Sequence, residues 1–283
     1  MNAGTFALRL GLTRGWTQFR HLMTTSDGIR DTLLWNAFPL VILILNSGRT
    51  FPGTTLPFPV VVLPGILGLM VVAVAWSVAF LLTTEREDGT LLRAKAIPHG
   101  MVGYVAGVAV GTTLETVIGM VILLLPSLLL FDGVTIADTG RALTFVGVLL
   151  LGLLAMLPFG FAIGSVVRSP RAVGGVGFLL IGGLAFVSGI VYPVQEMARW
   201  LQVVAQALPS YWVGLGMRSA FLPDAAAAWE VGGSWRTLEM VAVLGLWATV
   251  SMALAPVLLR RMARRESGSA MEQRRAEVLQ RIG

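Results

Sequence analysis

The sequence predicts an all-α integral membrane protein with six transmembrane helices, an N-terminal interfacial helix and an outer re-entrant helical hairpin between spans five and six. Of its 283 residues, 55% are hydrophobic and 13% are charged, whereas a soluble domain carries about 25% charged residues. The apolar residues gather in runs long enough to cross a bilayer. We therefore interpret residues 1–283 as one transmembrane domain, with the interfacial helix in 1–30, the six-span bundle in 31–259 and a basic tail in 260–283.

Residues 4–23 predict a helix that lies on the membrane surface. The apolar stripe is formed by Leu8, Leu12, Trp16, Phe19 and Met23. The adjacent polar stripe is formed by Arg9, Thr13, Thr17 and Arg20. An Arg-containing face beside a Trp, Phe and Leu face is typical of interfacial helices. The alternative is an amphipathic helix packed on a soluble domain, but the sequence predicts no such domain.

Six apolar runs predict the transmembrane spans. They are residues 31–47, 60–82, 101–131, 143–167, 172–191 and 238–259. The first run is interrupted by Asn36 and Pro39 and is the weakest of the six. Small residues allow helices to approach closely in lipid, so the glycines of the fifth span are predicted packing sites. These are Gly174, Gly175, Gly177, Gly182 and Gly183.

The distribution of positive charge predicts the orientation. Of 21 Lys and Arg residues, 16 fall in 1–30, 83–100, 167–171 and 260–283, on one side of a six-span bundle, and 5 fall on the other side. The positive-inside rule then places both termini in the cytoplasm. Because Lys95 is the only lysine, the composition is typical of a GC-rich bacterial genome and indicates a bacterial plasma membrane. The basic charge lies at the anionic inner leaflet, so the expected partner is the bilayer and not nucleic acid.

The outer segment between the last two predicted spans is partly apolar. Helical spacing relates Met197, Trp200, Leu201, Val204 and Leu208, and Pro209 ends that helix. A second short helix, residues 211–221, follows. Two short apolar helices hinged at a proline favour a hairpin that dips into the bilayer edge, and the alternative is an exposed loop with hydrophobic decoration.

Motifs for catalysis or nucleotide binding are missing from the sequence. Lys95 lies between Ala94 and Ala96, so there is no phosphate-binding loop of the Gly-Lys-Ser/Thr type. The chain has no cysteine, and its two histidines, His21 and His99, are far apart. Disulfides and thiolate metal sites are excluded, and we expect no cofactor or enzyme active site in this chain.

Glu115 is the one acidic residue deep inside a predicted span. An ionised carboxylate there costs about 3 kcal/mol on insertion scales, so it should face protein or water. One interpretation places it on a substrate or cation path. The other interpretations are a hydrogen bond to Thr112, to Thr113 or to a neighbouring span, or a protonated acid.

The segment Glu85-Arg86-Glu87-Asp88-Gly89-Thr90-Leu91, followed by Ile97-Pro98, resembles the cytoplasmic loop of ABC-2 type exporter permeases, including those of drug resistance. A second, looser match covers the fifth-span exit and hairpin of that family. It comprises Tyr192, Pro193, Trp200, Leu208 and Pro209. The resemblance extends over nearly the whole chain.

This resemblance implies a coupling helix at about residues 86–97 that sits in a groove of a cytoplasmic ABC ATPase dimer. The implied coupling residues are Glu85, Glu87, Asp88, Gly89, Thr90, Leu91 and Pro98. The carboxylates are expected to precede or open this helix, where negative charge favours the positive dipole end. ATP and Mg would bind to the partner ATPase only, and a second permease copy or a paralogue would complete the membrane unit.

The leading functional hypothesis is therefore a permease subunit of an ATP-driven exporter that moves a hydrophobic drug, lipid or glycoconjugate outward, with drug efflux favoured by the resemblance. The alternative is a proton-coupled secondary transporter or channel that uses Glu115 as a relay. Secondary transporters commonly show internal repeats, and no convincing repeat relates the halves of this sequence.

Overall fold

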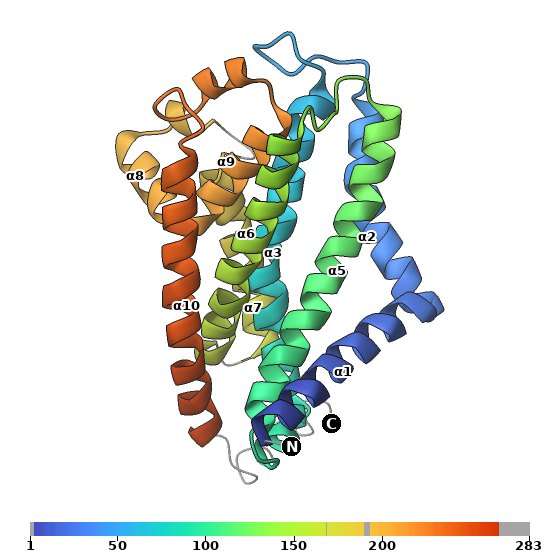
Figure 1. Ribbon diagram of the computed structural model, residues 1–283, viewed down its shortest axis with the longest axis vertical. Helices are drawn as coiled ribbons and strands as arrows, with labels where there is room; N and C mark the ends of the chain where they lie inside the picture. The colour runs from blue at the N-terminus through green and yellow to red at the C-terminus, as the bar shows by residue number, and fades with distance from the viewer. Residues whose placement is uncertain (1–2, 168, 190–192, 266–283) are drawn as a thin grey trace, which may run out of the picture.

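The computed structural model describes residues 3–167, 169–189 and 193–265, and within them every regular element is a helix (Figure 1). The α-helices are α1 (Ala3–Thr24), α2 (Ser26–Leu45), α3 (Phe58–Glu87), α4 (Thr90–Lys95), α5 (Gly100–Leu130), α6 (Thr139–Val166), α7 (Pro170–Val187), α8 (Arg199–Ala207), α9 (Pro209–Phe221) and α10 (Thr237–Arg265). Two 3₁₀ turns, η1 (Val194–Glu196) and η2 (Asp224–Trp229), flank the hairpin α8–α9. Tyr192 and residues 266–283 of the predicted basic tail lie outside the described residues.

Among the described residues, five helices are long and apolar enough to cross a membrane: α2, α3, α5, α6 and residues Thr237–Leu259 of α10. The 30 residues of α3 extend over about 45 Å, which exceeds the roughly 30 Å hydrocarbon core of a bilayer. The predicted fifth span forms the 18-residue helix α7, which is not among these five. The chain is thus a multi-pass helical membrane protein.

The helix predicted at residues 4–23 is confirmed as α1, and the next helix begins at Ser26, before the predicted start of the first span at residue 31. The break lies at Thr25, whose side-chain oxygen accepts a hydrogen bond from the Gly28 backbone N–H (3.3 Å) and caps α2. Because one residue separates the two helices, α1 turns directly into α2. Asn36 and Pro39 do not interrupt α2, which is continuous to Leu45.

Helix α3 forms the centre of the bundle and packs against α6, α7, α9 and α5 (Figure 1). Glycines of α6 bring its backbone close to α3: a Cβ atom at Gly160 would lie 2.5 Å from the carbonyl oxygen of Ala75. Gly68 of α3 likewise lies close to α9, because a Cβ atom at Gly68 would lie 3.3 Å from the Gly214 Cα. Small residues therefore set the spacing between the central helices.

The predicted packing glycines of the fifth span are mostly wrong. Only Gly177 is in close contact, because a Cβ atom there would lie 2.5 Å from the Trp76 indole. Open space surrounds Gly174, Gly175, Gly182 and Gly183 within the described part of the chain. Glycine frequency alone did not identify the packed face of this helix.

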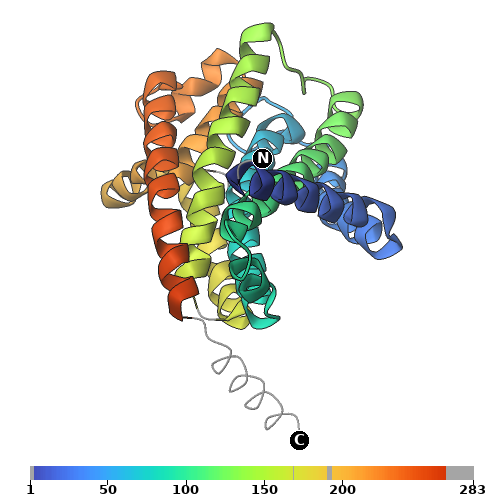
Figure 2. The same cartoon turned by 60° about the horizontal axis from the view of Figure 1, so that its bottom comes forward.

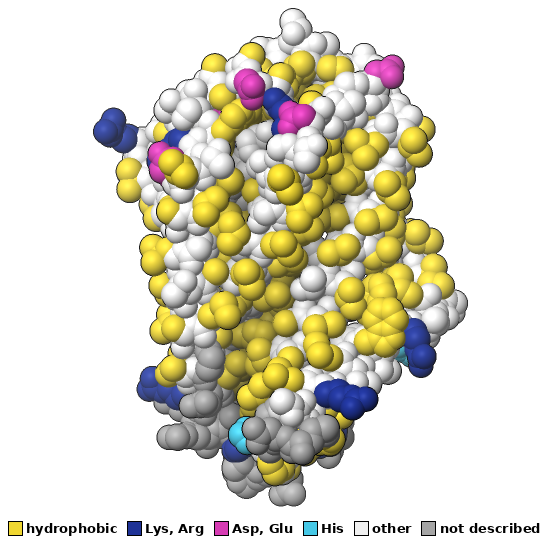
Figure 3. Space-filling view, viewed as in Figure 1, with side chains coloured by type: hydrophobic (Ala, Val, Ile, Leu, Met, Phe, Trp, Pro, Cys, Tyr) yellow, Lys and Arg dark blue, Asp and Glu magenta, His cyan; other side chains and the backbone are white. Residues whose placement is uncertain are grey.

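The surface separates apolar from charged side chains along the bundle (Figure 3). Hydrophobic side chains cover the middle of the face shown, and charged side chains gather toward its two ends. The start of α1 and the described end of α10 lie at the same end of the bundle (Figure 1). This separation is typical of a protein whose central band contacts lipid.

Candidate functional site

The predicted coupling segment forms a tight corner between α3 and α5. Helix α3 continues to Glu87, Gly89 adopts a left-handed backbone (φ 81°), and α4 begins at Thr90. One carboxylate oxygen of Asp88 accepts a hydrogen bond from the Thr90 backbone N–H (2.8 Å). Gly is the residue that adopts this φ without steric cost, which explains its place in the motif.

Two details of the predicted coupling helix are wrong. The helix spans Thr90–Lys95 and not residues 86–97. Glu85 and Glu87 belong to the last turn of α3, so they lie at the negative end of that helix dipole and do not open α4. Only Asp88 contacts a backbone N–H in the first turn of α4.

The coupling residues divide into an exposed group and a buried group. Glu87, Asp88 and Pro98 are exposed, whereas Leu91 is 2% exposed and anchors α4 in the hydrophobic core. Helix α4 contacts α3, α5 and α10. The segment therefore presents an acidic corner on a base that is packed against three long helices.

Glu85 has a different environment from the other two acidic residues. Arg14 of α1 donates two hydrogen bonds to its carboxylate, at 2.7 and 2.8 Å. The Arg14 guanidinium also lies 4.9 Å from the centre of the Tyr104 ring in α5. Both hydrogen bonds come from one guanidinium nitrogen, Nη2, and are charge-assisted, so these three residues connect α1, α3 and α5. The next residue, Arg86, donates to the Val167 carbonyl oxygen at the end of α6 (2.7 Å).

The contact between α1 and α5 depends on glycine. Ala7, Gly11 and Gly15 of α1 face Gly103 and Gly107 of α5, and a Cβ atom at Gly11 would lie 2.2 Å from the Gly103 carbonyl oxygen. Both sets recur at four-residue steps, the spacing that allows close helix contact in membranes. This contact between small residues was not predicted from the sequence. Helix α1 crosses the start of α5 (Figure 2). Of the predicted apolar stripe, Leu8, Leu12 and Trp16 are exposed.

A cavity of about 530 Å³ opens between α1, α4 and the start of α5. Its apolar walls come from Phe6, Leu10, Ile97 and Pro98, and Arg93 lies at its edge with Thr90. The Arg14–Glu85 pair closes one side. Among the predicted coupling residues, Glu85, Thr90 and Pro98 therefore share this groove.

The predicted outer hairpin forms two short helices joined at Leu208. Pro209 occupies the first position of α9, where its missing N–H needs no partner. All residues of α9 except Ser219 are buried, against α3, α6, α7 and α10. By contrast, Trp200 of α8 is 68% exposed. Pro193 precedes η1 and lies outside both helices.

A buried ion pair fixes the end of α9. Arg218 donates to both carboxylate oxygens of Glu230, at 2.5 and 3.1 Å, and both side chains are 8% exposed. Arg218 also donates to the Ser188 carbonyl oxygen at the end of α7 (3.3 Å). Three segments that are distant in the sequence are thus connected beside the end of α9.

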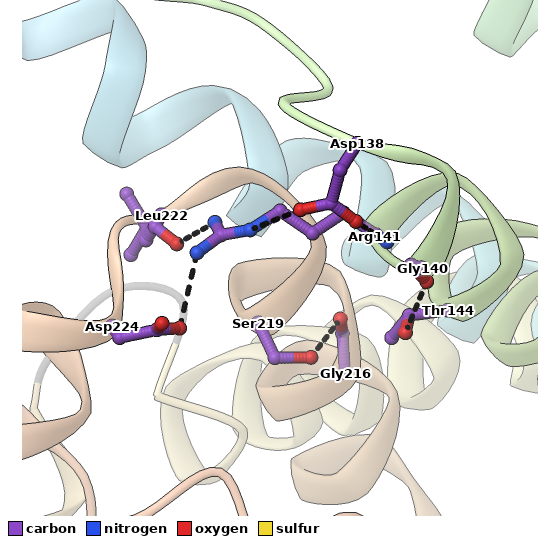
Figure 4. Close-up of polar contacts among 8 residues, drawn as sticks. All are labelled: Asp138, Gly140, Arg141, Thr144, Gly216, Ser219, Leu222 and Asp224. Carbon is purple, nitrogen blue, oxygen red and sulfur yellow. Dashed lines mark hydrogen bonds and ion pairs between the residues drawn. The ribbon is translucent and has the colours of Figure 1, made fainter.

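A second arginine connects α9 to α6 (Figure 4). Arg141 donates to the Leu222 carbonyl oxygen, pairs with Asp224 at 3.0 Å and lies 3.7 Å from Asp138. The Asp138 side chain also accepts from the Arg141 backbone N–H (2.9 Å) and caps α6. The hairpin is therefore fixed to the start of α6 as well as to the end of α7.

Glu115 lies on the packed face of α5. Gly111 and Thr112 one turn before it and Gly119 one turn after it are buried, while Glu115 is partly exposed. The predicted hydrogen bond to Thr112 or Thr113 does not form in the part of the chain described, and the Thr112 carbonyl oxygen instead accepts from Thr116 (2.8 Å).

The described residues thus form a helical membrane bundle with an exposed acidic corner between α3 and α4. Comparison with known families agrees: a family model described as ABC-2 type transporter matches residues 19–222. The chain belongs to the ABC-2 type transporter family.

A relative within this family is the daunorubicin resistance ABC transporter permease protein DrrB1 from Streptomyces coeruleorubidus. It is 27% identical to this chain over 204 residues, and the match covers 69% of each protein. The matched family region includes the coupling corner, α5 and the hairpin.

Proposed function

We propose that this chain is the permease subunit of an ATP-driven exporter and that a cytoplasmic ABC ATPase dimer drives it from the corner formed by Glu87 and Asp88. The exposed acidic corner carries the proposal, because it combines the family motif with accessible negative charge on a firmly packed base. A basic groove of the ATPase subunit would accept these carboxylates. ATP and Mg would be bound by that subunit.

The contacts of the corner support a route for the mechanical signal. Leu91 holds α4 to the core, and Glu85 connects the end of α3 to Arg14 of α1. A displacement of α4 on ATPase closure would therefore move α1, α3 and α5 together. Closely packed interfaces change between discrete arrangements and do not deform continuously.

We also propose the orientation, in which α7 crosses the membrane as the fifth span along the chain and raises the number of crossings to six. The end of α6 is bonded to the end of α3 through Arg86 and Val167. The end of α7 is bonded through Ser188 and Arg218 to α9, whose last turn joins the start of α6. Helix α7 therefore runs from one end of the bundle to the other, and its 18 residues extend over about 27 Å. Six crossings place both termini on the side of the Arg-rich segments, the cytoplasm.

Under the same topology, α1 lies along the inner membrane surface and α8–α9 form a re-entrant hairpin in the outer leaflet. Exposed Leu8, Leu12 and Trp16 support the first assignment. The burial of α9 beside the exposed Trp200 of α8 supports the second. We further propose that a second permease copy or paralogue completes the pathway.

The relative's name supports a hydrophobic drug as the exported substrate, in preference to a lipid or glycoconjugate. Family membership also favours ATP-driven export over a proton-coupled transporter that uses Glu115.

Reconstitution with a co-expressed cytoplasmic ABC ATPase tests the proposal. We expect ATP-dependent accumulation of daunorubicin in inside-out proteoliposomes, and transport by the permease alone would refute it. The double substitution Glu87→Arg and Asp88→Arg should abolish co-purification of the ATPase. Asp27→Arg, which also reverses an exposed acid, is the matched control and should leave it unchanged.

Labelling tests the orientation, because the chain has no cysteine to give background. A membrane-impermeant maleimide should label Asp132→Cys in intact cells and Glu87→Cys only after permeabilisation. The opposite pattern would place the acidic corner outside the cell and overturn the exporter assignment.

A further inference from the structure

The feature that the coupling mechanism does not use is Glu115. Four neighbours on its face of α5 are buried: Val108, Gly111, Thr112 and Gly119. Glu115 keeps partial exposure between them. Glu115 therefore lies on the packed side of α5 and is still partly accessible.

Two amide side chains from other helices lie one turn to either side of Glu115. Gln18 of α1 packs at Gly111, with its Oε1 atom 3.7 Å from the position of a Cβ atom there. Asn36 of α2 packs at Gly119, with its Oδ1 atom 2.5 Å from the corresponding position. Residues four apart share one helix face, so both amides approach the face of α5 that carries Glu115.

The described contacts leave an acceptor atom on the face of α5 that carries Glu115. The Asn36 side-chain N–H group donates to the Thr32 carbonyl oxygen (2.7 Å), which leaves Oδ1 toward α5. Within the described residues, no hydrogen bond or ion pair reaches the Glu115 carboxylate. The nearby cation on α1, Arg14, is already paired with Glu85.

A carboxylate in the membrane requires a counter-charge or a donor, because apolar surroundings do not solvate it. Protein groups supply neither in the described residues. We propose that Glu115, with Gln18 and Asn36, binds the ammonium group of an amphiphilic cationic substrate on its way through the permease. The carboxylate provides the charge, the two amides accept further N–H donors, and the apolar walls of α2 and α5 contact the rest of the molecule.

This inference rests on the proposed export function for its biological role, but its test needs no ATPase. Daunorubicin carries a protonated amine at pH 7, and its N-acetyl derivative is neutral. Binding of each to the full-length permease in phosphatidylcholine nanodiscs is measured by fluorescence anisotropy. We expect the cation to bind about tenfold more tightly than the neutral derivative, since a charge-assisted hydrogen bond contributes this much.

The substitution Glu115→Gln should abolish that preference by weakening the cation alone, and Glu115→Asp, which retains the charge, should preserve it. Asn36→Ala tests the site from a second helix and should weaken the cation several-fold. Glu239→Gln is the matched control: this acid is 53% exposed and lies beside Arg236 in the first turn of α10, so the preference should persist.

Equal affinity of the two probes for the wild-type permease, or no binding of either, would overturn the proposal. It would also fail if Glu115→Gln kept the tenfold preference. The export function has a separate criterion, ATP-dependent transport with the ATPase, so either result can fail while the other stands.

Discussion

The ion pair between Arg218 and Glu230 should be the most destabilising polar contact to break among the described residues. Both side chains are 8% exposed, and the pair is bidentate. Removing one partner of such a pair leaves an uncompensated buried charge, which costs about 3–5 kcal/mol. The substitution Arg218→Met leaves Glu230 in this position and removes the donor to Ser188. At roughly 2–4 °C per kcal/mol, the thermal midpoint should fall by about 10 °C.

The assay is thermal unfolding of the detergent-solubilised permease, followed by fluorescence-detected size exclusion. Arg30→Met is the matched control, because Arg30 and its partner Asp27 are 62% and 81% exposed and an exposed pair contributes at most about 1 kcal/mol. The double variant Arg218→Met, Glu230→Leu should recover most of the loss, since no charge is left buried. A decrease for Arg218→Met no larger than for Arg30→Met, or a double variant as unstable as the sum of the single variants, would refute this reasoning.

Three further predictions concern the contacts around the coupling corner. Gly11→Ala places a Cβ atom 2.2 Å from a carbonyl oxygen and should cost about 1–3 kcal/mol as overpacking, whereas Gly245→Ala, in open space, should not lower the midpoint. Arg14→Ala should reduce drug-stimulated ATP hydrolysis by the reconstituted complex, and the exchanged pair Arg14→Glu, Glu85→Arg should restore part of it; no restoration would mean that the ion pair does not carry the coupling. Gly89→Ala, at φ 81°, should cost about 1–2 kcal/mol and lower ATPase co-purification, and an unchanged yield would show that the corner tolerates a different backbone.

The sequence predicted the positions of the long helices because lipid requires continuous apolar runs, and those runs are visible without any knowledge of contacts. It also predicted two short helices hinged at Pro209, since proline cannot continue a helix. Helix α8 ends before this residue, and α9 begins at it and not at residue 211. It did not predict that α3 continues to Glu87. The acidic motif resembles a helix start, but the left-handed Gly89 places the break after it.

Packing partners were harder to predict, because a small residue allows close contact without requiring it. The glycines of α7 are frequent but mostly in open space, whereas the glycines of α1 and α5 bring the backbones of the two helices into contact. The difference lies in periodicity on two helices at once: steps of four residues recur from Ala7 to Gly15 and from Gly103 to Gly111. A pair of matched four-residue repeats is a stronger signal of contact than glycine content.

The α1 helix contacts both the coupling corner and the face of α5 that carries Glu115. Arg14 bonds to Glu85, and one turn later Gln18 packs at Gly111, about 6 Å along the helix. Because α1 and α5 meet through backbone atoms, no flexible side chain separates them, and a force on the corner would displace the two helices as one unit. Asn36 belongs to α2, of which only 11% of the apolar window is buried. Helix α2 follows α1 after one residue and packs at Gly119 of α5 through Asn36, so a force that the proposed ATPase applied at the corner would also reach Asn36, the third residue of the proposed ammonium site.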